Sequence, residues 1–152
     1  MNIVQQLEQF MRESNQIERE LRLNPNDFNV AKRVYEKGIN SLNDILKIHK
    51  DLTKHLKVDW SGKWRNCNVY VGNYIAPQWY VVPELMAQYW KQFPDMDSWT
   101  AHNEFEKIHP FQDFNGRMGR LIWLSKVINE GYDFSILFLH AYYYQTLQHV
   151  NK

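Results

Sequence analysis

Residues 121–128 are apolar almost all round, and this segment limits the fold more than any other. Its apolar side chains are Leu121, Ile122, Trp123, Leu124, Val127 and Ile128. A helix with one apolar stripe lies on the surface of a domain, whereas a helix that is apolar on every side must be covered by other elements. The sequence therefore predicts a helix in the middle of a domain, ending near Gly131.

The twelve residues from His109 to Arg120 lead into this helix and combine a base, a carboxylate, a turn of small residues and two arginines. Apolar residues at helical spacing precede them, namely Ala101, Phe105 and Ile108. Pro110 stops that helix, so His109 is expected at its exit. Residues 97–130 are thus predicted to form a helix, a loop and a second helix.

The loop also predicts an anion-binding site. Asn115 and Gly116 open the buried helix, where backbone N–H groups and the helix dipole favour negative charge. Arg117 and Arg120 are three residues apart, so both are expected on one helical face beside these N–H groups, as ligands of phosphate oxygens. Asp113 precedes the turn and is the candidate ligand of a magnesium ion that bridges phosphates.

These residues resemble the signature of the Fic (FIDO) domains, H-P-F-x-D/E-G-N-G-R-x-x-R. The matching positions are His109, Pro110, Phe111, Asp113, Asn115, Gly116, Arg117 and Arg120. Phe114 stands where most members have glycine, and positive φ at this position would strain a phenylalanine by roughly 1 kcal/mol. Phe114 still counts as a nucleotide-site residue, because backbone N–H groups form the cradle.

The N-terminal segment, residues 1–23, is a candidate inhibitory helix. Apolar residues form one stripe along it: Ile3, Leu7, Phe10, Ile17 and Leu21. Ser14 lies on that stripe and Glu18 follows four residues later, which resembles the Fic inhibitory motif S/T-x-x-x-E-G/N, with Arg19 in place of the last residue. We predict that Glu18 is a buried carboxylate paired with Arg120.

Residues 62–82 interrupt the helical pattern, and residues 68–74 are predicted to form a strand and a turn, hence a short hairpin. The resemblance implies that this hairpin is the flap beside the active site. Val69, Tyr70 and Val71 are then the residues that dock a segment of the target protein by main-chain pairing.

The remaining segments are predicted to be helical. Asp27 is expected to cap a helix that carries Phe28, Ala31, Val34 and Tyr35 and ends at Gly38. The next helix is expected to bury Leu42, Ile45, Leu46, His49, Leu52 and Leu56, with His49 as a hydrogen-bonded structural histidine. Pro83 is expected to start another helix at its first position, and residues 134–150 to form a last one.

Composition limits the remaining possibilities. A chain of 152 residues with 44% hydrophobic content suits one domain over residues 1–152. Eighteen basic and 17 acidic residues give no field for nucleic acid or membranes, and no apolar run is long enough to span a bilayer, so we expect a cytoplasmic protein. Cys67 is the only cysteine, and the scattered histidines give a zinc site little support.

The resemblance implies a mainly α, Fic-type fold and the transfer of AMP from Mg-ATP to a Tyr, Thr or Ser hydroxyl of a target protein. In this scheme His109 takes the hydroxyl proton, and Asp113 holds Mg²⁺. Arg117 contacts phosphate, and Arg120 binds the outermost phosphate. Two alternatives stay open: a phosphotransferase or a transferase with another nucleotide donor, and a silent binding module blocked by Phe114. The sequence assigns no oligomeric state.

Overall fold

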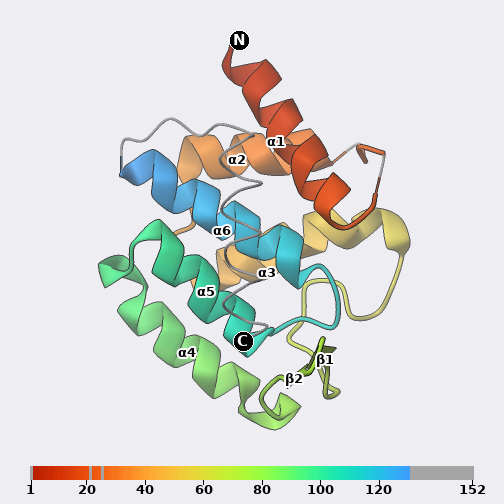
Figure 1. Ribbon diagram of the computed structural model, residues 1–152, viewed down its shortest axis with the longest axis vertical. Coiled ribbons are helices and arrows are strands. Elements are labelled where there is room, and N and C mark those ends of the chain that lie inside the picture. Colours follow the sequence, from red (N-terminus) through yellow and green to blue (C-terminus); the bar gives the residue numbers. More distant parts are fainter. Residues whose placement is uncertain (1, 21, 25, 131–152) are drawn as a thin grey trace.

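The computed structural model is organised around one helix, α6 (Asn115–Asn129), which runs through its centre (Figure 1). The structure describes residues 2–20, 22–24 and 26–130. The helix predicted for residues 134–150 lies outside this part of the chain.

The described part is mainly α, as predicted, with one two-stranded hairpin. The other helices in chain order are α1 (Ile3–Ile17), α2 (Asp27–Lys37), α3 (Leu42–Thr53), α4 (Val82–Gln92) and α5 (Ser98–Ile108). The hairpin consists of β1 (Tyr70–Val71) and β2 (Tyr74–Ile75), and short 3₁₀ turns are η1 (Lys54–Leu56), η2 (Trp79–Val81) and η3 (Phe93–Asp95).

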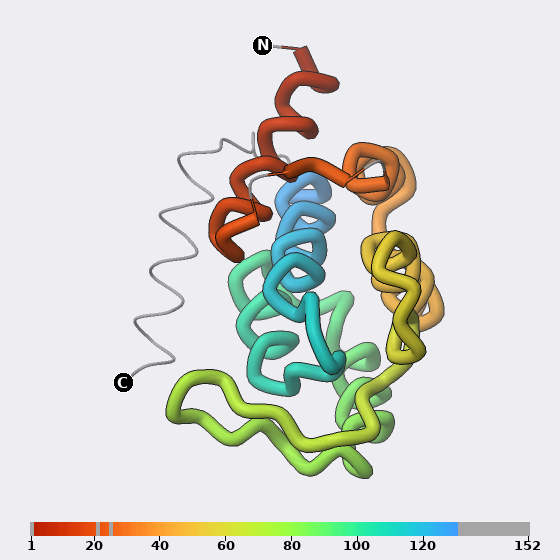
Figure 2. Tube along the Cα trace, turned by 90° about the vertical axis from the view of Figure 1, so that its right-hand side faces the viewer, coloured from red at the N-terminus to blue at the C-terminus, as the bar shows by residue number. Residues whose placement is uncertain are grey.

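Four helices cover α6: α5, α2, α1 and α3 all pack against it. Every residue from Met118 to Val127 is buried. Trp123, the largest fully buried side chain, stacks on Phe10 of α1 with ring centroids 6.2 Å apart. Figure 2 shows α1 running alongside α6 on one side of the molecule. The prediction of a central, fully covered helix is confirmed, and no helix in the described ranges has both the length and the apolar character needed to cross a bilayer.

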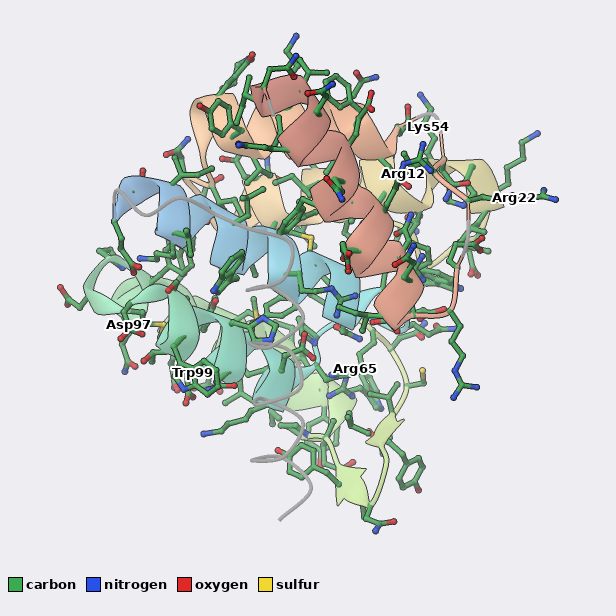
Figure 3. All side chains as sticks on the ribbon, turned by 45° about the horizontal axis from the view of Figure 1, so that its top comes forward. Arg12, Arg22, Lys54, Arg65, Asp97 and Trp99 are labelled. Carbon is green, nitrogen blue, oxygen red and sulfur yellow. The ribbon has the colours of Figure 1, made fainter. Side chains whose placement is uncertain are left out.

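Side-chain caps set the start of two helices that position the site. Ser41 accepts the N–H of Asp44 at the start of α3, and Asp97 accepts the N–H of Thr100 at the start of α5. In Figure 3 Asp97 marks the start of α5, and Arg65 lies near its other end. The cap therefore fixes which face of α5 reaches the loop that follows it.

Helix α1 ends earlier than predicted. The stripe of residues 1–23 implies a helix through Leu21, but α1 stops at Ile17. Arg19 has the left-handed conformation (φ 60°), and the N–H groups of Arg19 and Glu20 donate to the carbonyls of Gln16 and Asn15. These are the bonds of a helix C-terminus, where glycine or asparagine is preferred because side chains crowd the left-handed backbone.

Three details of the α2–α4 predictions are wrong. Asp27 is the first residue of α2 rather than its cap, and its buried carboxylate accepts the Asn24 N–H and the Asn15 side-chain amide. Leu56 is exposed instead of buried. Helix α4 starts one residue before Pro83, so this proline occupies the second position. His49 is buried and hydrogen-bonded, as predicted.

The hairpin is present but short, with Tyr70 opposite Ile75 and Val71 opposite Tyr74. Gly72 supplies the positive φ (60°) that a two-residue turn requires. Tyr70 and Ile75 are 71% and 63% exposed, so this cross-strand pair faces solvent. The Tyr74 hydroxyl donates to the Lys107 carbonyl and so ties the hairpin to the end of α5.

Candidate functional site

A cleft of about 780 Å³ lies where the hairpin, the end of α5, the start of α6 and the end of α1 meet. Its volume falls in the range of ligand sites in proteins. Residues from each predicted group line it, namely Glu18 just after α1, Val69, Tyr70 and Val71 from the hairpin, His109, and Asp113, Phe114, Asn115, Gly116 and Arg117. Glu106 lines it as well.

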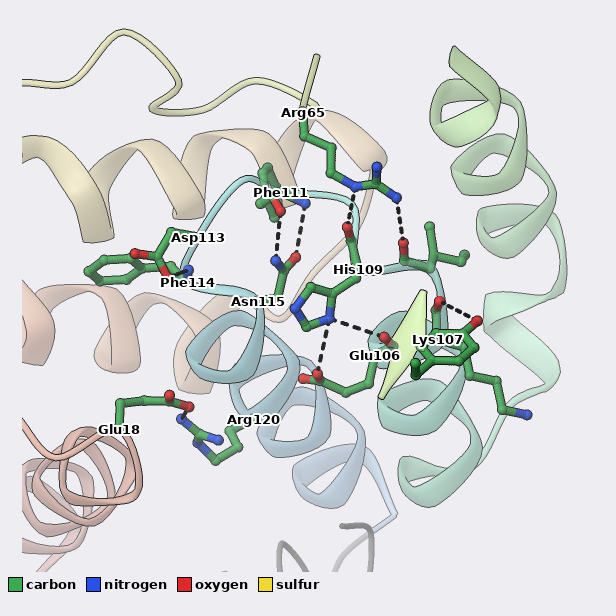
Figure 4. A network of polar contacts seen from close by, with 12 residues as sticks. Glu18, Arg65, Glu106, Lys107, His109, Phe111, Asp113, Phe114, Asn115 and Arg120 are labelled. Carbon is green, nitrogen blue, oxygen red and sulfur yellow. Dashed lines mark hydrogen bonds and ion pairs between the residues drawn. The ribbon is translucent and has the colours of Figure 1, made fainter. Parts of the chain in front are cut away.

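His109 is held at the exit of α5, as predicted. Its backbone is left-handed (φ 51°), and its N–H still donates to the Phe105 carbonyl. The ring Nδ1 lies 3.2 Å from the Glu106 carbonyl oxygen (Figure 4). Because a carbonyl only accepts, Nδ1 carries the hydrogen in the neutral ring, and Nε2 is left as the basic nitrogen. Burial lowers the pKa of His109, while the Glu106 carbonyl and the Arg65 charge act in opposite directions on it.

Glu106 is a site residue that the sequence reasoning missed. Its Oε2 is 3.7 Å from the His109 Nδ1, and its Oε1 is buried with no hydrogen-bond partner among the described residues. A side chain at Gly119 would collide with this oxygen, so the glycine makes room for it. Burial raises the pKa of Glu106 to about 8. Burial thus favours the neutral, protonated form of this carboxyl group beside His109.

The side chain of Asn115 has a role that the sequence analysis did not assign, because only the backbone N–H group of this residue was predicted to bind an anion. Its buried side chain bonds both the N–H and the carbonyl of Phe111, at 2.9 and 2.7 Å, and so staples the loop closed. The side chain is therefore unavailable to a phosphate. Asn115 can therefore contribute only its backbone N–H group, together with the other N–H groups of the first turn of α6, to the binding of an anion.

The carboxylate of Glu18 lies at this turn. A Cβ atom added to Gly116 would collide with Glu18 Oε1 and would lie 3.2 Å from Arg120 Nη1. Glycine at this position thus leaves room for the Glu18 carboxylate at the start of α6. The side chain of Glu18 is 32% exposed, so the predicted buried carboxylate is only partly covered, because α1 ends before it.

Arg120 is paired with Glu18, as predicted, but it does not line the cleft. Its side chain is 1% exposed and lies under α1, where Nη2 donates to Glu18 Oε1 at 2.8 Å. Two further bonds run to Ser14: Nε donates to the hydroxyl at 2.7 Å and Nη2 to the carbonyl at 3.0 Å. The expectation that Arg117 and Arg120 share one face of the site is wrong, because α1 covers Arg120.

Phe114 has the positive φ (70°) that its place in the loop implies. Its ring is 7% exposed and packs beside His49 and Trp60, with centroids 6.5 and 6.4 Å away. The guanidinium carbon of Arg117 lies 3.5 Å from the Phe114 ring centroid, within the range of a cation–π contact. The Phe114 ring thus packs the loop against His49 and Trp60 and holds Arg117 at the cleft.

Two variants separate the stabilisation by the Phe114 ring from the strain of its positive φ. Phe114→Ala removes the ring packing and keeps a Cβ in the left-handed region, so we expect a loss of unfolding free energy of about 3 kcal/mol. Phe114→Gly removes the ring and also the strain, so its loss should be smaller by roughly 1 kcal/mol. Urea unfolding measures both. An alanine variant as stable as the glycine variant would show that the backbone at this position is not strained.

Asp113 is exposed at the rim of the cleft, with its Oδ1 accepting the Phe114 N–H. His49 fixes the backbone here: Nδ1 accepts the Gly62 N–H, so Nε2 carries the hydrogen and donates to the Asp113 carbonyl at 3.0 Å. Within the described ranges no group of three or more His, Cys, Asp or Glu residues is placed to hold a metal. One carboxylate fits Mg²⁺ that is held mainly by phosphates and water.

Arg65 is the second residue that the sequence reasoning missed. It is 3% exposed and reaches from the segment before the hairpin to the backbone of His109 (Figure 4). Its partners are backbone carbonyls, which every residue carries, so no side-chain pattern could have identified them.

A family model described as the Fic/DOC family matches residues 39–124. "Protein adenylyltransferase Fic" of Culex quinquefasciatus is 31% identical over 101 residues, which are 60% of this chain and 20% of that protein. The protein of the same name from Aedes aegypti is 34% identical over 101 residues, with the same coverage. The chain therefore spans about a fifth of the length of these curated relatives.

Two solved structures show the same fold. A Fic family protein from Desulfovibrio desulfuricans G20 superposes with a TM-score of 0.59 at 24% identity, covering 84% of this chain and 48% of that one. Fic-1 (aa134–508) from C. elegans gives a TM-score of 0.57 at 18% identity, covering 99% of this chain and 58% of that one. At these identities the likeness concerns the fold.

Proposed function

Because the chain belongs to the Fic/DOC family, we propose that it is an enzyme that transfers AMP from ATP to a hydroxyl group of a target protein. The observation that carries the proposal is one cleft in which the His109 ring and Arg117 lie beside the first turn of α6. The name adenylyltransferase, borne by relatives that are 31% and 34% identical, points to the same reaction.

His109 would act as the general base. Its Nδ1 is turned to the Glu106 carbonyl, so Nε2 is the nitrogen that would accept the proton of the target hydroxyl. As the proton leaves, the hydroxyl oxygen would form a bond to the α-phosphorus of ATP, and the bond from that phosphorus to the bridging oxygen would break. Pyrophosphate would leave with the electron pair of that bond.

The start of α6 and Arg117 would hold the phosphates. The backbone N–H groups at Asn115 and Gly116 and the positive end of the helix dipole favour anions, and Arg117 at the cleft adds a full charge. Phosphoryl-type transfers need little covalent chemistry from the protein, so correct placement of the phosphates accounts for most of the expected rate gain.

Asp113 would hold Mg²⁺ against these phosphates from the rim of the cleft. The chemistry that Mg²⁺ supplies when bound is neutralisation of the charge on the phosphate oxygens. The staple from the Asn115 side chain to Phe111 and the bond from His49 to the Asp113 carbonyl would keep the carboxylate in place.

Helix α1 would inhibit the enzyme. Ser14 and Glu18 together take three hydrogen bonds from Arg120, the arginine that would otherwise bind the outermost phosphate. Glu18 also lies against Gly116, where that phosphate would bind. In this arrangement ATP would bind weakly or with its α-phosphate turned away from His109.

The hairpin would dock the target. Val69, Tyr70 and Val71 line the cleft, and an extended segment that pairs with a strand edge would carry its Tyr, Thr or Ser hydroxyl toward His109. Affinity would come from main-chain hydrogen bonds, and the choice of acceptor from the side chains around them.

Shortening the hairpin tests this docking role. The Ala76 N–H donates to the Val69 carbonyl, so a two-residue Asn-Gly turn can join these residues and leave the chain on either side in place. We expect transfer to protein targets to fall by roughly tenfold or more, because two or three main-chain hydrogen bonds are lost. The affinity for ATP, measured by calorimetry, should stay the same. An equal loss of ATP binding would contradict the docking role.

Mass spectrometry tests the proposed reaction. A lysate is incubated with the protein, Mg²⁺ and one nucleotide at a time, and the His109→Ala variant serves as the control. The proposal expects the added mass of one AMP on a hydroxyl side chain, with ATP as donor and His109 present. An added phosphate or a different nucleotide would indicate the alternative transferases. No added mass with the wild type or with the Glu18→Gly variant would indicate a binding module. The most strongly modified protein becomes the acceptor in quantitative assays.

A further inference from the structure

Arg65 is a buried guanidinium whose partners are backbone carbonyls. Nε donates to the His109 carbonyl at 2.7 Å, and Nη1 donates to the Cys67 carbonyl at 3.0 Å. Nη2 donates to the carbonyls of Pro77 at 2.6 Å and Ile108 at 3.3 Å. Within the described ranges no carboxylate forms an ion pair with Arg65, so the charge is satisfied entirely by peptide oxygens.

These carbonyls belong to two separate segments of the chain, the ends of the hairpin and the end of α5. Cys67 lies just before β1 and Pro77 just after β2, so the guanidinium joins both ends of the hairpin. Ile108 and His109 lie on the other side, at the end of α5, and the backbone N–H of Arg65 itself donates to the Pro110 carbonyl at 2.9 Å. Figure 4 shows Arg65 with its hydrogen bond to the backbone of His109, at the end of α5.

The type of residue matters here. A buried charge is costly unless it is fully hydrogen-bonded, so an apolar side chain would fill the same space at lower cost. Only arginine offers five donors in a fixed planar fork, which can hold several carbonyls in one geometry. Lysine carries the same charge on a flexible stem and cannot reproduce the fork.

The carbonyl of His109 is the most informative of the four partners. His109 has a left-handed backbone (φ 51°, ψ 61°), a conformation that a non-glycine residue keeps only where its surroundings enforce it. The 2.7 Å bond from Arg65 Nε acts on the peptide group of that same residue. The direction of the His109 ring therefore depends on Arg65.

We propose that Arg65 is a positioning residue that holds the backbone of His109 and both ends of the hairpin as one unit. A target segment docked on the hairpin then presents its hydroxyl at a fixed place relative to the His109 ring. The consequence for catalysis rests on the proposed function, whereas the coupling between hairpin and loop does not.

Arg65→Lys tests the proposal, and Arg33→Lys is the matched control. Arg33 pairs with Asp44 and Asp51 at 3.4 and 3.8 Å on the α2–α3 surface, away from the cleft. Hydrogen exchange of the intact chain without ligand gives the first measurement. In Arg65→Lys we expect faster exchange in residues 67–77 and 108–111 together, with α3 and α6 unchanged. Arg33→Lys should leave both segments as in the wild type.

AMP transfer to the identified acceptor gives the second measurement, in the wild-type chain and in the Glu18→Gly background. A displacement of about 1 Å between reacting groups can cost about 100-fold in rate, so we expect kcat to fall by about this factor in Arg65→Lys. The affinity for ATP, measured by calorimetry, should not change, because no contact of Arg65 reaches the phosphate turn. Loss of ATP affinity in parallel with kcat would overturn the positioning role.

The exchange data decide the coupling independently of activity. Faster exchange in the hairpin alone would show that Arg65 does not link the two segments. Wild-type kcat with both segments loosened would keep the link and overturn the positioning role in catalysis. Arg65→Gln is the second variant, because an unpaired buried ammonium can unfold a chain by itself. If both variants also expose α3 and α6, Arg65 is a general stability residue and the proposal is wrong. Coupled exchange in a chain that never transfers AMP would reject the proposed function and retain the link.

Discussion

His109→Ala should lower the rate of AMP transfer by about 100- to 10,000-fold, the usual contribution of a general base. The ring is the only part of the residue that the proposed reaction uses, while its backbone is held by Phe105 and Arg65. The fold should therefore persist, which circular dichroism checks. Transfer is measured as AMP incorporated into the acceptor per unit time. A variant that works at the wild-type rate would remove His109 from the role of base.

The pH dependence of the wild type is a second sign of the same group. Burial lowers the pKa of His109 from its ordinary value of 6.5, so the ring stays neutral, and able to accept a proton, in more acidic solution. The transfer rate should therefore fall only below pH 6.5, as the ring gains a proton. The residual rate of His109→Ala should lack this acidic limb. A wild-type limb centred well above pH 6.5 would point to another titrating group.

Glu18→Gly should raise AMP transfer by about 10- to 100-fold. The change frees Arg120 from a charged hydrogen bond worth about 1.5–3 kcal/mol, and each 1.4 kcal/mol corresponds to about a factor of ten. Arg120 keeps its two hydrogen bonds to Ser14 after this change, so the free energy of unfolding should fall only modestly. The initial rate at low ATP concentration is the measurement. A Glu18→Gly protein no more active than the wild type would exclude inhibition through this residue.

Two further variants separate the parts of this effect. Glu18→Gln keeps the size of the side chain beside Gly116 and removes its charge, so a smaller gain than with glycine is expected. Glu18→Gly combined with Arg120→Ala should lose the gain, because both changes act on one contact and cannot be additive. A double variant as active as Glu18→Gly alone would show that α1 inhibits without Arg120.

Local sequence rules predicted the parts of the site that lie close together in the chain. The helix before His109 and the buried helix α6 follow from spacing, proline and apolar residues. The positive φ at Phe114 was instead implied by the glycine that most Fic domains have at this position. The pairing of Glu18 with Arg120 is a long-range contact, and it was predictable because a carboxylate on an apolar stripe requires a cation.

What the sequence could not predict depends on packing between distant segments. Arg120 was expected to face the cleft beside Arg117, but α1 covers it. The neutral state of Glu106 follows from burial and from the space left by Gly119, neither of which has a local signal. Arg65 was assigned to the flap region, yet its four carbonyl partners are backbone groups that no residue type reveals.

Glu18 lies at the place where an anion would bind, and it is attached to the same chain. Under the proposed function it is a tethered competitor of ATP, and its effective concentration does not fall when the protein is diluted. The apparent affinity for ATP is then the intrinsic affinity multiplied by the fraction of molecules whose α1 is displaced. A partner that binds α1 only when α1 is displaced would raise the affinity for ATP. By linkage, ATP would raise the affinity for that partner by the same factor. The concentration of ATP and the concentration of such a partner would then shift the same equilibrium between the bound and the displaced α1.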